Sequence, residues 1–177
     1  MGGNDPARSA RSVLAVAVAR QEKSNWCWAA IACSVARYYG IGTYRQADVA
    51  AGLFDADGWN VIAPLDEALA VAGCAGYWSP GRPAFERIGA EIDAGRPLGV
   101  CIQWPTGPAH YVLITGCFRV TREIYVDDPL HGRSVQPFAD FPMTYHGLEA
   151  VWRGVYWTSP APQPASAERC TYERTRA

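Results

Sequence analysis

The sequence predicts an α+β fold, in which a helical first half is followed by an antiparallel β-sheet. Three observations support this class. Segments with helical start and stop residues lie before residue 95, and apolar strand-like runs follow it. Of the 177 residues, 49% are hydrophobic and 19% charged, which is typical of one globular domain with a sizeable core. Helices and strands that are segregated along the chain in this way favour α+β over alternating α/β architecture.

The first helix is expected to begin near Asn25 and to run to Tyr39, with Gly40 as its stop residue. Its stretch WCWAAIACSVARYY is apolar nearly all round. A helix of this kind is typically buried on every face rather than laid on a surface.

Three further helices are expected before residue 95. The segment TYRQADVAAG has Thr43 and Gln46 at capping-box spacing. The segment PLDEALAVAG has Pro64 in its first turn, followed by two acidic residues. The last of these helices is expected from Ala84 to Ala94, with its apolar residues on one stripe.

Strands are expected mainly in the second half, in PLGVCIQW, HYVLITGCF, EIYVDDP and AVWRGVYW. An alternating run over 13–18 predicts one short strand before the first helix. PTGPA and DPLHGR have the composition of loops. We expect a flexible N-terminus over 1–11, one domain over 12–158, and a disordered, Pro/Ala/Ser-rich tail over 159–177.

Charge and hydropathy argue against two classes of partner. The net charge is −1 and the pI is near 6.3, so neither nucleic acid nor a membrane is an expected partner. The apolar run in RSVLAVAVAR is followed at once by Arg20 and lacks a small-residue cleavage site, so no Sec signal peptide is expected. The protein is expected to be cytoplasmic or to be delivered by a specialised secretion system.

The cysteines differ in their surroundings. The chain has six, without a CxxC pair or a Cys/His cluster of zinc-ligand spacing, so no metal site, cofactor or disulfide framework is expected. We expect most of them to be small buried hydrophobes, namely Cys33, Cys74, Cys101 and Cys117. Cys27 is different, because it lies between two tryptophans where a polar loop enters the first helix. In a first helical turn, unpaired N–H groups and the helix dipole stabilise a thiolate, which makes the cysteine nucleophilic.

A base for this thiol must come from the three histidines of the chain. His131 and His146 lie in loop sequence and are expected to be bystanders. His110 starts a strongly apolar strand that forms a predicted hairpin with EIYVDDP. If the hairpin turns near position 119, His110 faces Asp128, which would fix the imidazole tautomer. The register is not determined by the sequence, so Asp127 remains an alternative.

Gln21 is the expected fourth member of the site. It lies six residues before Cys27, and its side-chain amide, together with the Cys27 backbone N–H, would form an oxyanion hole. The aromatic residues around the site are less specific. Trp26, Trp28 and Trp104 would wall a substrate groove or pack the core, and the core role is favoured for Trp28.

The set "Q…NWCWAA", "AHYVLITG" and "IYVDDP" resembles the papain-like cysteine peptidases, in the order Gln, Cys, His, Asp. Within that clan it is most similar to bacterial avirulence effector proteases and to leader-peptide-cleaving peptidases. The resemblance implies a papain-like fold, with Cys27 as nucleophile, His110 as general base and acid, Asp128 as orienting residue and Gln21 as oxyanion donor. Two departures are an alanine rather than glycine before His110, and Asp where the plant enzymes have Asn.

The activity that the resemblance implies is cleavage of a specific protein target by a bacterial effector or toxin domain. An immunity protein, inhibitor or host activator would be a further partner. Glutamine deamidation, transglutamination and leader-peptide processing remain open, because the same triad serves all of them. A non-catalytic binding domain on the same fold would predict an impaired triad. The active assignment requires Cys27 and His110 to meet across a cleft between two lobes.

Overall fold

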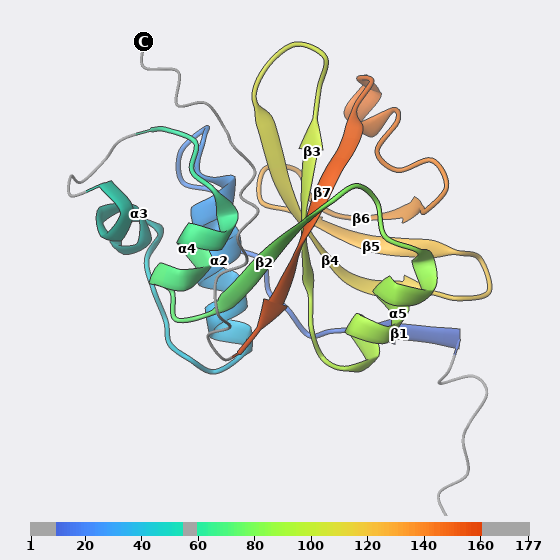
Figure 1. Cartoon of the computed structure of the whole chain (residues 1–177), viewed down its shortest axis with the longest axis horizontal. Helices are drawn as coiled ribbons and strands as arrows, with labels where there is room; N and C mark the ends of the chain where they lie inside the picture. Colours follow the sequence, from blue (N-terminus) through green and yellow to red (C-terminus); the bar gives the residue numbers. More distant parts are fainter. Residues whose placement is uncertain (1–9, 55–59, 161–177) are drawn as a thin grey trace, which may run out of the picture.

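The computed structural model describes residues 10–54 and 60–160, and its helices lie on both sides of a central sheet (Figure 1). The helices are α2 (Cys27–Tyr38), α3 (Gln46–Phe54), α4 (Leu65–Val71) and α5 (Phe85–Asp93), with a 3₁₀ turn at Tyr145–Gly147. The strands are β1 (Arg11–Val13), β2 (Ala75–Pro80), β3 (Leu98–Gln103), β4 (Ala109–Phe118), β5 (Glu123–Asp128), β6 (Gly132–Pro137) and β7 (Val151–Ser159). Most of the predicted flexible N-terminus (1–11) and of the predicted tail lies outside the described residues, whereas Arg11 belongs to β1.

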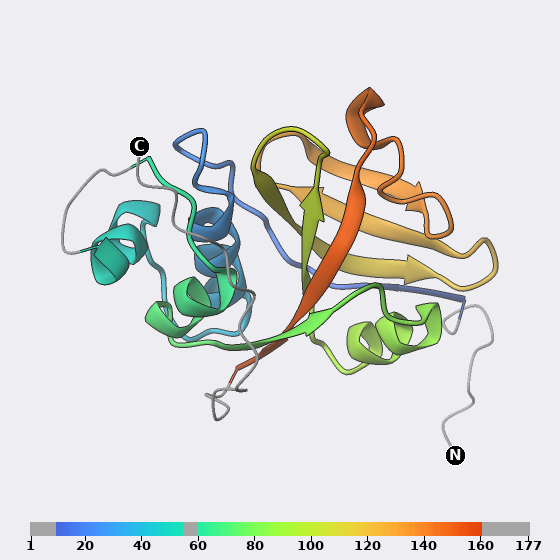
Figure 2. The ribbon, with the colours of Figure 1, turned by 45° about the horizontal axis from the view of Figure 1, so that its top comes forward.

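The sheet has the order β2-β7-β3-β4-β5-β6, with β1 paired to β4, and every pair is antiparallel. This confirms the expected α+β class with an antiparallel sheet in the second half. Helices α2, α3 and α4 form one layer beside the sheet, whereas α5 lies on the other side, near β1 (Figure 2). Among the described residues, no helix is long and apolar enough to cross a membrane.

Helix α2 is the centre of the larger core. Its residues from Cys27 to Ala36 are all buried, as predicted from a sequence that is apolar all round. The helix ends before Gly40, which adopts the left-handed conformation (φ 69°) expected of a stop residue. Tyr111 and Leu113 of β4 pack in the same cluster, so the helix that carries Cys27 is fixed directly against the sheet.

The opposite face of the sheet packs against α5. Phe85, Ile88 and Ile92 form the predicted apolar stripe, and they cluster with alternate strand residues such as Val112 and Ile114. From Ala109 to Ile114, strand β4 therefore contributes odd-numbered apolar side chains to one core and even-numbered ones to the other. This accounts for its unbroken apolar sequence, because a strand covered on both faces has no polar side.

Several of the secondary-structure predictions were wrong. A short strand was predicted over 13–18, but β1 spans Arg11–Val13 and shares only Val13 with that range. The predicted capping box of Thr43 and Gln46 does not form, because Gln46 is the first residue of α3 and its side chain bonds elsewhere. Strands β2 and β6 were not predicted, and DPLHGR is not loop throughout, since β6 begins at Gly132.

Candidate active site

Cys27 is the first residue of α2 and is 3% exposed. The backbone N–H groups of this first turn have no acceptor within the helix, and they point toward the residues before it. Trp26 and Trp28 on either side are almost fully buried. The Trp28 indole N–H donates to the Val61 carbonyl at 3.0 Å, so the predicted core role of Trp28 is confirmed.

His110 is the second residue of β4 and lies between Cys27 and Asp128. Its Nε2 is 2.8 Å from Asp128 Oδ1, and the bond is buried. A second hydrogen bond joins the imidazole to the Cys27 side chain. Because Nε2 is committed to the carboxylate, Nδ1 is the nitrogen available to the sulfur. The sequence-predicted Cys27, His110 and Asp128 are thus brought together in one chain of contacts.

The electrostatics of the Cys27–His110–Asp128 site favour the protonated imidazole and the ionised carboxylate. Burial alone would lower the pKa of His110, but the hydrogen bonds to Asp128 and Cys27 and the negative charge on both residues raise it to about 9. Burial likewise opposes ionisation of Asp128, yet the hydrogen bond and charge of His110 lower its pKa to about 2. An imidazolium held between a carboxylate and a sulfur is the arrangement that stabilises a thiolate at neutral pH.

Asp128 is held from several directions. Its Oδ1 also accepts the backbone N–H groups of Leu130 (2.7 Å) and His131 (3.2 Å), and its Oδ2 accepts the Tyr145 hydroxyl at 2.9 Å. Burial and the adjacent Asp128 carboxylate raise the pKa of Tyr145, so this phenol remains a neutral donor. Tyr145 was not predicted from the sequence, because it lies in a loop where no spacing indicates a contact with β5.

Asp127, the sequence-level alternative to Asp128, faces other partners. It accepts the Thr115 hydroxyl at 2.5 Å and the Arg133 guanidinium at 2.8 and 3.0 Å. Consecutive strand residues point to opposite faces, so only one of the two carboxylates can reach His110. The structure therefore brings Asp128 rather than Asp127 to the imidazole.

The hairpin register differs from the one expected. The paired residues run from Phe118–Glu123 to Leu113–Asp127, with an irregularity at Thr115, so the turn is centred beyond position 119. Extending the register places Asp128 opposite Val112. His110 is then the diagonal neighbour of Asp128 on the same face, and its side chain still spans the gap.

Gln21 lies in the loop before α2 and is tied to the end of β5. Its backbone N–H donates to the Pro129 carbonyl at 2.9 Å, immediately after Asp128. Its side-chain Nε2 donates to the carbonyls of Lys23 (2.9 Å) and Ser24 (2.7 Å), while Oε1 is buried with no hydrogen-bond partner in the described part of the chain. The amide is thus next to the candidate site, with both hydrogens directed to its own loop.

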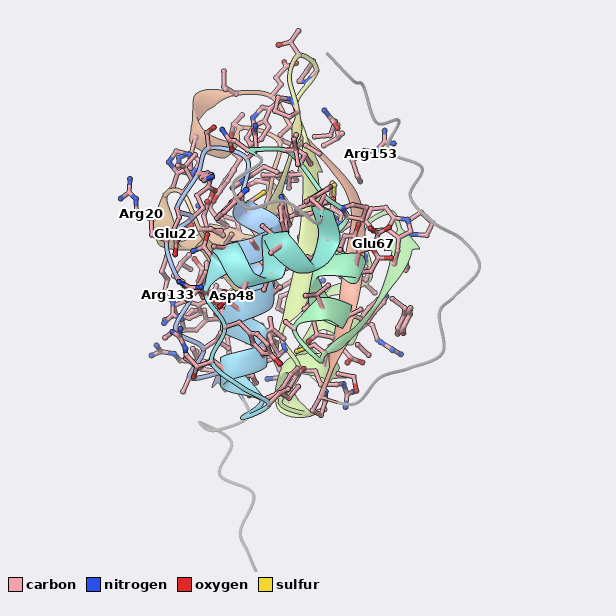
Figure 3. The ribbon with its side chains drawn as sticks, turned by 90° about the vertical axis from the view of Figure 1, so that its left-hand side faces the viewer. Arg20, Glu22, Asp48, Glu67, Arg133 and Arg153 are labelled. Atoms are coloured by element: carbon pink, nitrogen blue, oxygen red, sulfur yellow. The ribbon has the colours of Figure 1, made fainter. Side chains whose placement is uncertain are left out.

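Gln46 braces this loop from α3, a role that the sequence analysis missed. Its Nε2 donates to the Arg20 carbonyl at 2.7 Å, and its Oε1 accepts the Glu22 backbone N–H at 3.0 Å. The two bonds bracket Gln21, whose neighbours Arg20 and Glu22 are exposed (Figure 3). The side chain of Gln46 is buried, so its amide replaces solvent as the partner of this stretch of backbone.

The Trp104 ring lies beside the imidazole, with its centroid 5.9 Å from that of His110. The remaining histidines also lie near Asp128. His146 Nε2 is 3.9 Å from Asp128 Oδ2, and the His146 and His131 rings pack with centroids 3.8 Å apart. Burial and the neighbouring His131 lower the pKa of His146. Both were expected to be bystanders, and among the residues that the structure describes neither bonds Cys27, but they lie close to the Asp128 carboxylate.

Cys33, Cys74, Cys101 and Cys117 are all buried, as predicted for packing residues. Burial raises the pKa of Cys33 to about 11 and that of Cys74 to about 12, and it also raises the pKa of Cys117. These thiols stay protonated at neutral pH and are poor nucleophiles. Cys170 lies outside the described residues.

Comparison with known families gives the family to which the chain belongs. Residues 8–146 match the family model described as "Papain-like cysteine protease AvrRpt2". The chain belongs to this family. The protein is therefore a papain-like cysteine peptidase, a hydrolase that acts on protein substrates, and the expected resemblance to avirulence effector proteases is confirmed. No curated protein sequence matches the chain.

Solved structures confirm the papain-like fold of this AvrRpt2-family chain. The peptidase domain of Streptococcus ComA, a bi-functional ABC transporter of a quorum-sensing pathway, is 18% identical with a TM-score of 0.60, covering 82% of this chain and 97% of that one. A double-glycine-motif protease from an AMS/PCAT transporter, solved with its leader peptide, is 19% identical with a TM-score of 0.51, covering 80% and 94%. Pseudomonas AvrPphB also matches, at 12% identity and a TM-score of 0.32, over 63% and 68%.

Proposed function

We propose that this peptidase cleaves a peptide bond in a specific protein target, with Cys27 as nucleophile, His110 as general base and acid, and Asp128 as the residue that orients the imidazole. The observation that supports this assignment best is the continuous chain of contacts from the Cys27 side chain through His110 to Asp128 at 2.8 Å. Two of its members are fixed by the cores of the fold, α2 on one side and β4 on the other.

The reaction would proceed through an acyl-enzyme. The Cys27 thiolate attacks the scissile carbonyl carbon and forms a C–S bond, and the carbonyl π electrons move to the oxygen. His110, protonated at Nδ1, gives this proton to the departing amine as the C–N bond breaks. A water molecule, deprotonated by His110, then attacks the thioester and releases the acid and the thiolate. Asp128 keeps Nε2–H of the imidazole bonded throughout.

The oxyanion would be stabilised by the backbone N–H of Cys27 and by the Gln21 amide. In the structure, both Gln21 hydrogens are directed to the carbonyls of Lys23 and Ser24. Donation to an oxyanion therefore requires one of these bonds to be shared or the amide to turn when substrate binds. The buried Oε1 has no hydrogen-bond partner in the described part of the chain, so turning the amide breaks no bond to this oxygen. Trp104, beside His110, is placed to contact the substrate.

We infer that the biological role is that of a bacterial effector or toxin domain, with an immunity protein, inhibitor or host factor as its control. Family membership supports this role, because the family model is defined on an avirulence-type protease. Delivery by a specialised secretion system and a cytoplasmic site of action are consistent with that role. Deamidation or transglutamination of a glutamine would use the same three residues and gives a different product.

The decisive experiment compares the protein with its Cys27→Ala variant in a cell lysate, followed by mass spectrometry of newly formed protein N-termini. We expect termini that appear only with the active protein and that share a cleavage sequence. Cys33→Ala is the matched control, because Cys33 lies on the same buried helix and its thiol stays protonated. Conversion of glutamine to glutamate without new termini would show a deamidase instead, and identical termini with Cys27→Ala would exclude the proposed triad.

A further inference from the structure

The three histidines of the chain converge on one carboxylate, although they are far apart in sequence. His110 contacts Asp128 Oδ1, whereas His146 Nε2 lies 3.9 Å from Oδ2 and the His146 ring packs against that of His131. The ligand-capable atoms of Asp128, His131 and His146 all lie within 4.8 Å of one another. We propose that these three residues form an inhibitory site for zinc or a similar divalent transition-metal ion next to the catalytic centre.

The ligand set has the composition that such ions prefer. Two imidazoles and a carboxylate suit zinc, nickel and copper, and three protein ligands leave one position for water. In tetrahedral coordination at about 2.0–2.1 Å, ligand atoms are about 3.3 Å apart. His146 Nε2 and Asp128 Oδ2 are 3.9 Å apart, so small side-chain rotations are sufficient to bring them into contact with one ion.

The two histidines are accessible and the carboxylate is not. The His146 side chain is 40% exposed and His131 is exposed, whereas the Asp128 side chain is fully buried. A hydrated ion can therefore approach from the histidine side, and it reaches Oδ2 by displacing the Tyr145 hydroxyl. The backbone of His146 is left-handed (φ 53°, ψ 35°), a conformation that is uncommon outside glycine and in which Asn, Asp and His are enriched, and its Nε2 lies 3.9 Å from Asp128 Oδ2.

The inhibitory effect follows from competition for Asp128 and rests on the function proposed above. The Tyr145 hydroxyl now bonds Oδ2 at 2.9 Å, and a metal ion would take this oxygen. A bound dication would neutralise the carboxylate that keeps His110 in position, although it would not touch Cys27. Metal binding itself does not depend on that function, so the two parts can be tested separately.

Binding is tested by isothermal titration with zinc chloride in a Cys27→Ala, Cys170→Ser background, which removes the nucleophile and a cysteine of the tail. We expect one ion per chain, with binding at least about tenfold weaker in His131→Gln and in His146→Asn, because loss of even an outer-shell partner costs that much. Asparagine is chosen at position 146 because it tolerates the left-handed backbone. Tyr145→Phe is the control, since it leaves all three ligands in place and should retain binding.

Equal zinc affinity in the background and in both histidine variants would overturn the proposal. Inhibition is tested in the active enzyme carrying Cys170→Ser, where zinc should inhibit peptide cleavage and His131→Gln should require at least about tenfold more zinc. If His131→Gln is inhibited at the same concentration, the ion bridges Cys27 and His110 and the proposal is wrong. If the metal-free enzyme shows no cleavage at all, the proposed function fails while the titration still decides the metal site.

Discussion

Asp128 lies diagonally rather than directly opposite His110 across the β4–β5 pair, and the two side chains still meet at 2.8 Å. A diagonal pair depends on both backbone register and rotamer. Leu130, His131 and Tyr145 fix the carboxylate from its other sides. The imidazole therefore meets a partner that is already oriented before substrate binds.

Replacing Asp128 separates its charge from its hydrogen bond. Asp128→Asn keeps an oxygen that accepts from His110 Nε2–H but removes the negative charge, so the pKa of His110 should fall below its present value of about 9. Turnover should decrease, but less than in Asp128→Ala, which removes the acceptor as well. The pKa is measured by following the imidazole signals by NMR as a function of pH. An unchanged His110 pKa in Asp128→Asn would contradict the assigned partnership.

The pH dependence of catalysis should have an alkaline limb set by His110. The pKa of this group is raised, so its proton is present below about pH 9 and is lost as the pH rises through that value. Without the proton, the imidazole neither stabilises the thiolate nor protonates the leaving amine. We expect kcat/KM to fall above about pH 9 in the wild-type protein, and at lower pH in Asp128→Asn. A rate that keeps rising above that pH would count against the ion pair.

Gln21 should contribute through its N–H donor rather than through its size. Gln21→Glu keeps the shape but replaces the donor by a carboxylate, and we expect kcat to fall by about 10²–10³ with a smaller change in KM. The same side chain also supports its own loop, so the melting temperature is measured in parallel. If activity is lost and the Gln21→Ala variant is unfolded at the assay temperature, the role of Gln21 is structural.

Gln46 is expected to be a positioning residue. Gln46→Ala removes two hydrogen bonds to the loop that contains Gln21, each of which contributes about 0.5–1.5 kcal/mol. The loop backbone should then be less ordered, and kcat should fall although the side-chain hydrogen bonds of Gln46 go to Arg20 and Glu22. Gln46→Glu restores the acceptor for the Glu22 N–H but not the donor to Arg20, so it should recover part of the loss. Full activity in Gln46→Ala would exclude the positioning role.

Gly154 in β7 should tolerate no side chain. A Cβ there would lie 2.3 Å from Trp78 and 2.5 Å from the Ser79 carbonyl oxygen, and the backbone atom cannot move aside as a flexible side chain would. Gly154→Ala should destabilise the fold by about 1–3 kcal/mol, as overpacking does. Urea unfolding monitored by tryptophan fluorescence measures this change. Gly81→Ala is the comparison, because a Cβ at Gly81 would have no atom within 4 Å. It measures the effect of replacing a glycine of left-handed backbone without a steric clash.

The parts of the fold that the sequence predicted are those with a strong local signal. Helix α2 has an apolar residue at nearly every position and a glycine stop, and the central strands are long apolar runs. Strand β6 was not predicted because it lies at the edge of the sheet and is mostly exposed, so its sequence has no apolar run. Strand β2 contains glycine and proline, which are depleted in strands.

The residues of the site also divide into those with a local sequence signal and those without one. Residue type and helix entry indicated Cys27, and the hairpin indicated His110 with an adjacent acid. The choice between Asp127 and Asp128 depended on an irregular register at Thr115, which no local pattern encodes. Tyr145 and Gln46 reach the site from a loop and from another helix, so only the three-dimensional structure reveals them.

The two neighbouring aspartates on β5 have a consequence for assembly of the enzyme. Asp127 pairs with Arg133 of β6 and with Thr115, while Asp128 pairs with His110. Sliding β5 by one residue would exchange the two carboxylates between the faces of the sheet and leave both sets of partners unmatched. A chain that folds with this error would lose both the Asp127–Arg133 ion pair and its activity. The interactions that stabilise the fold and those that orient the imidazole therefore require the same register of β5.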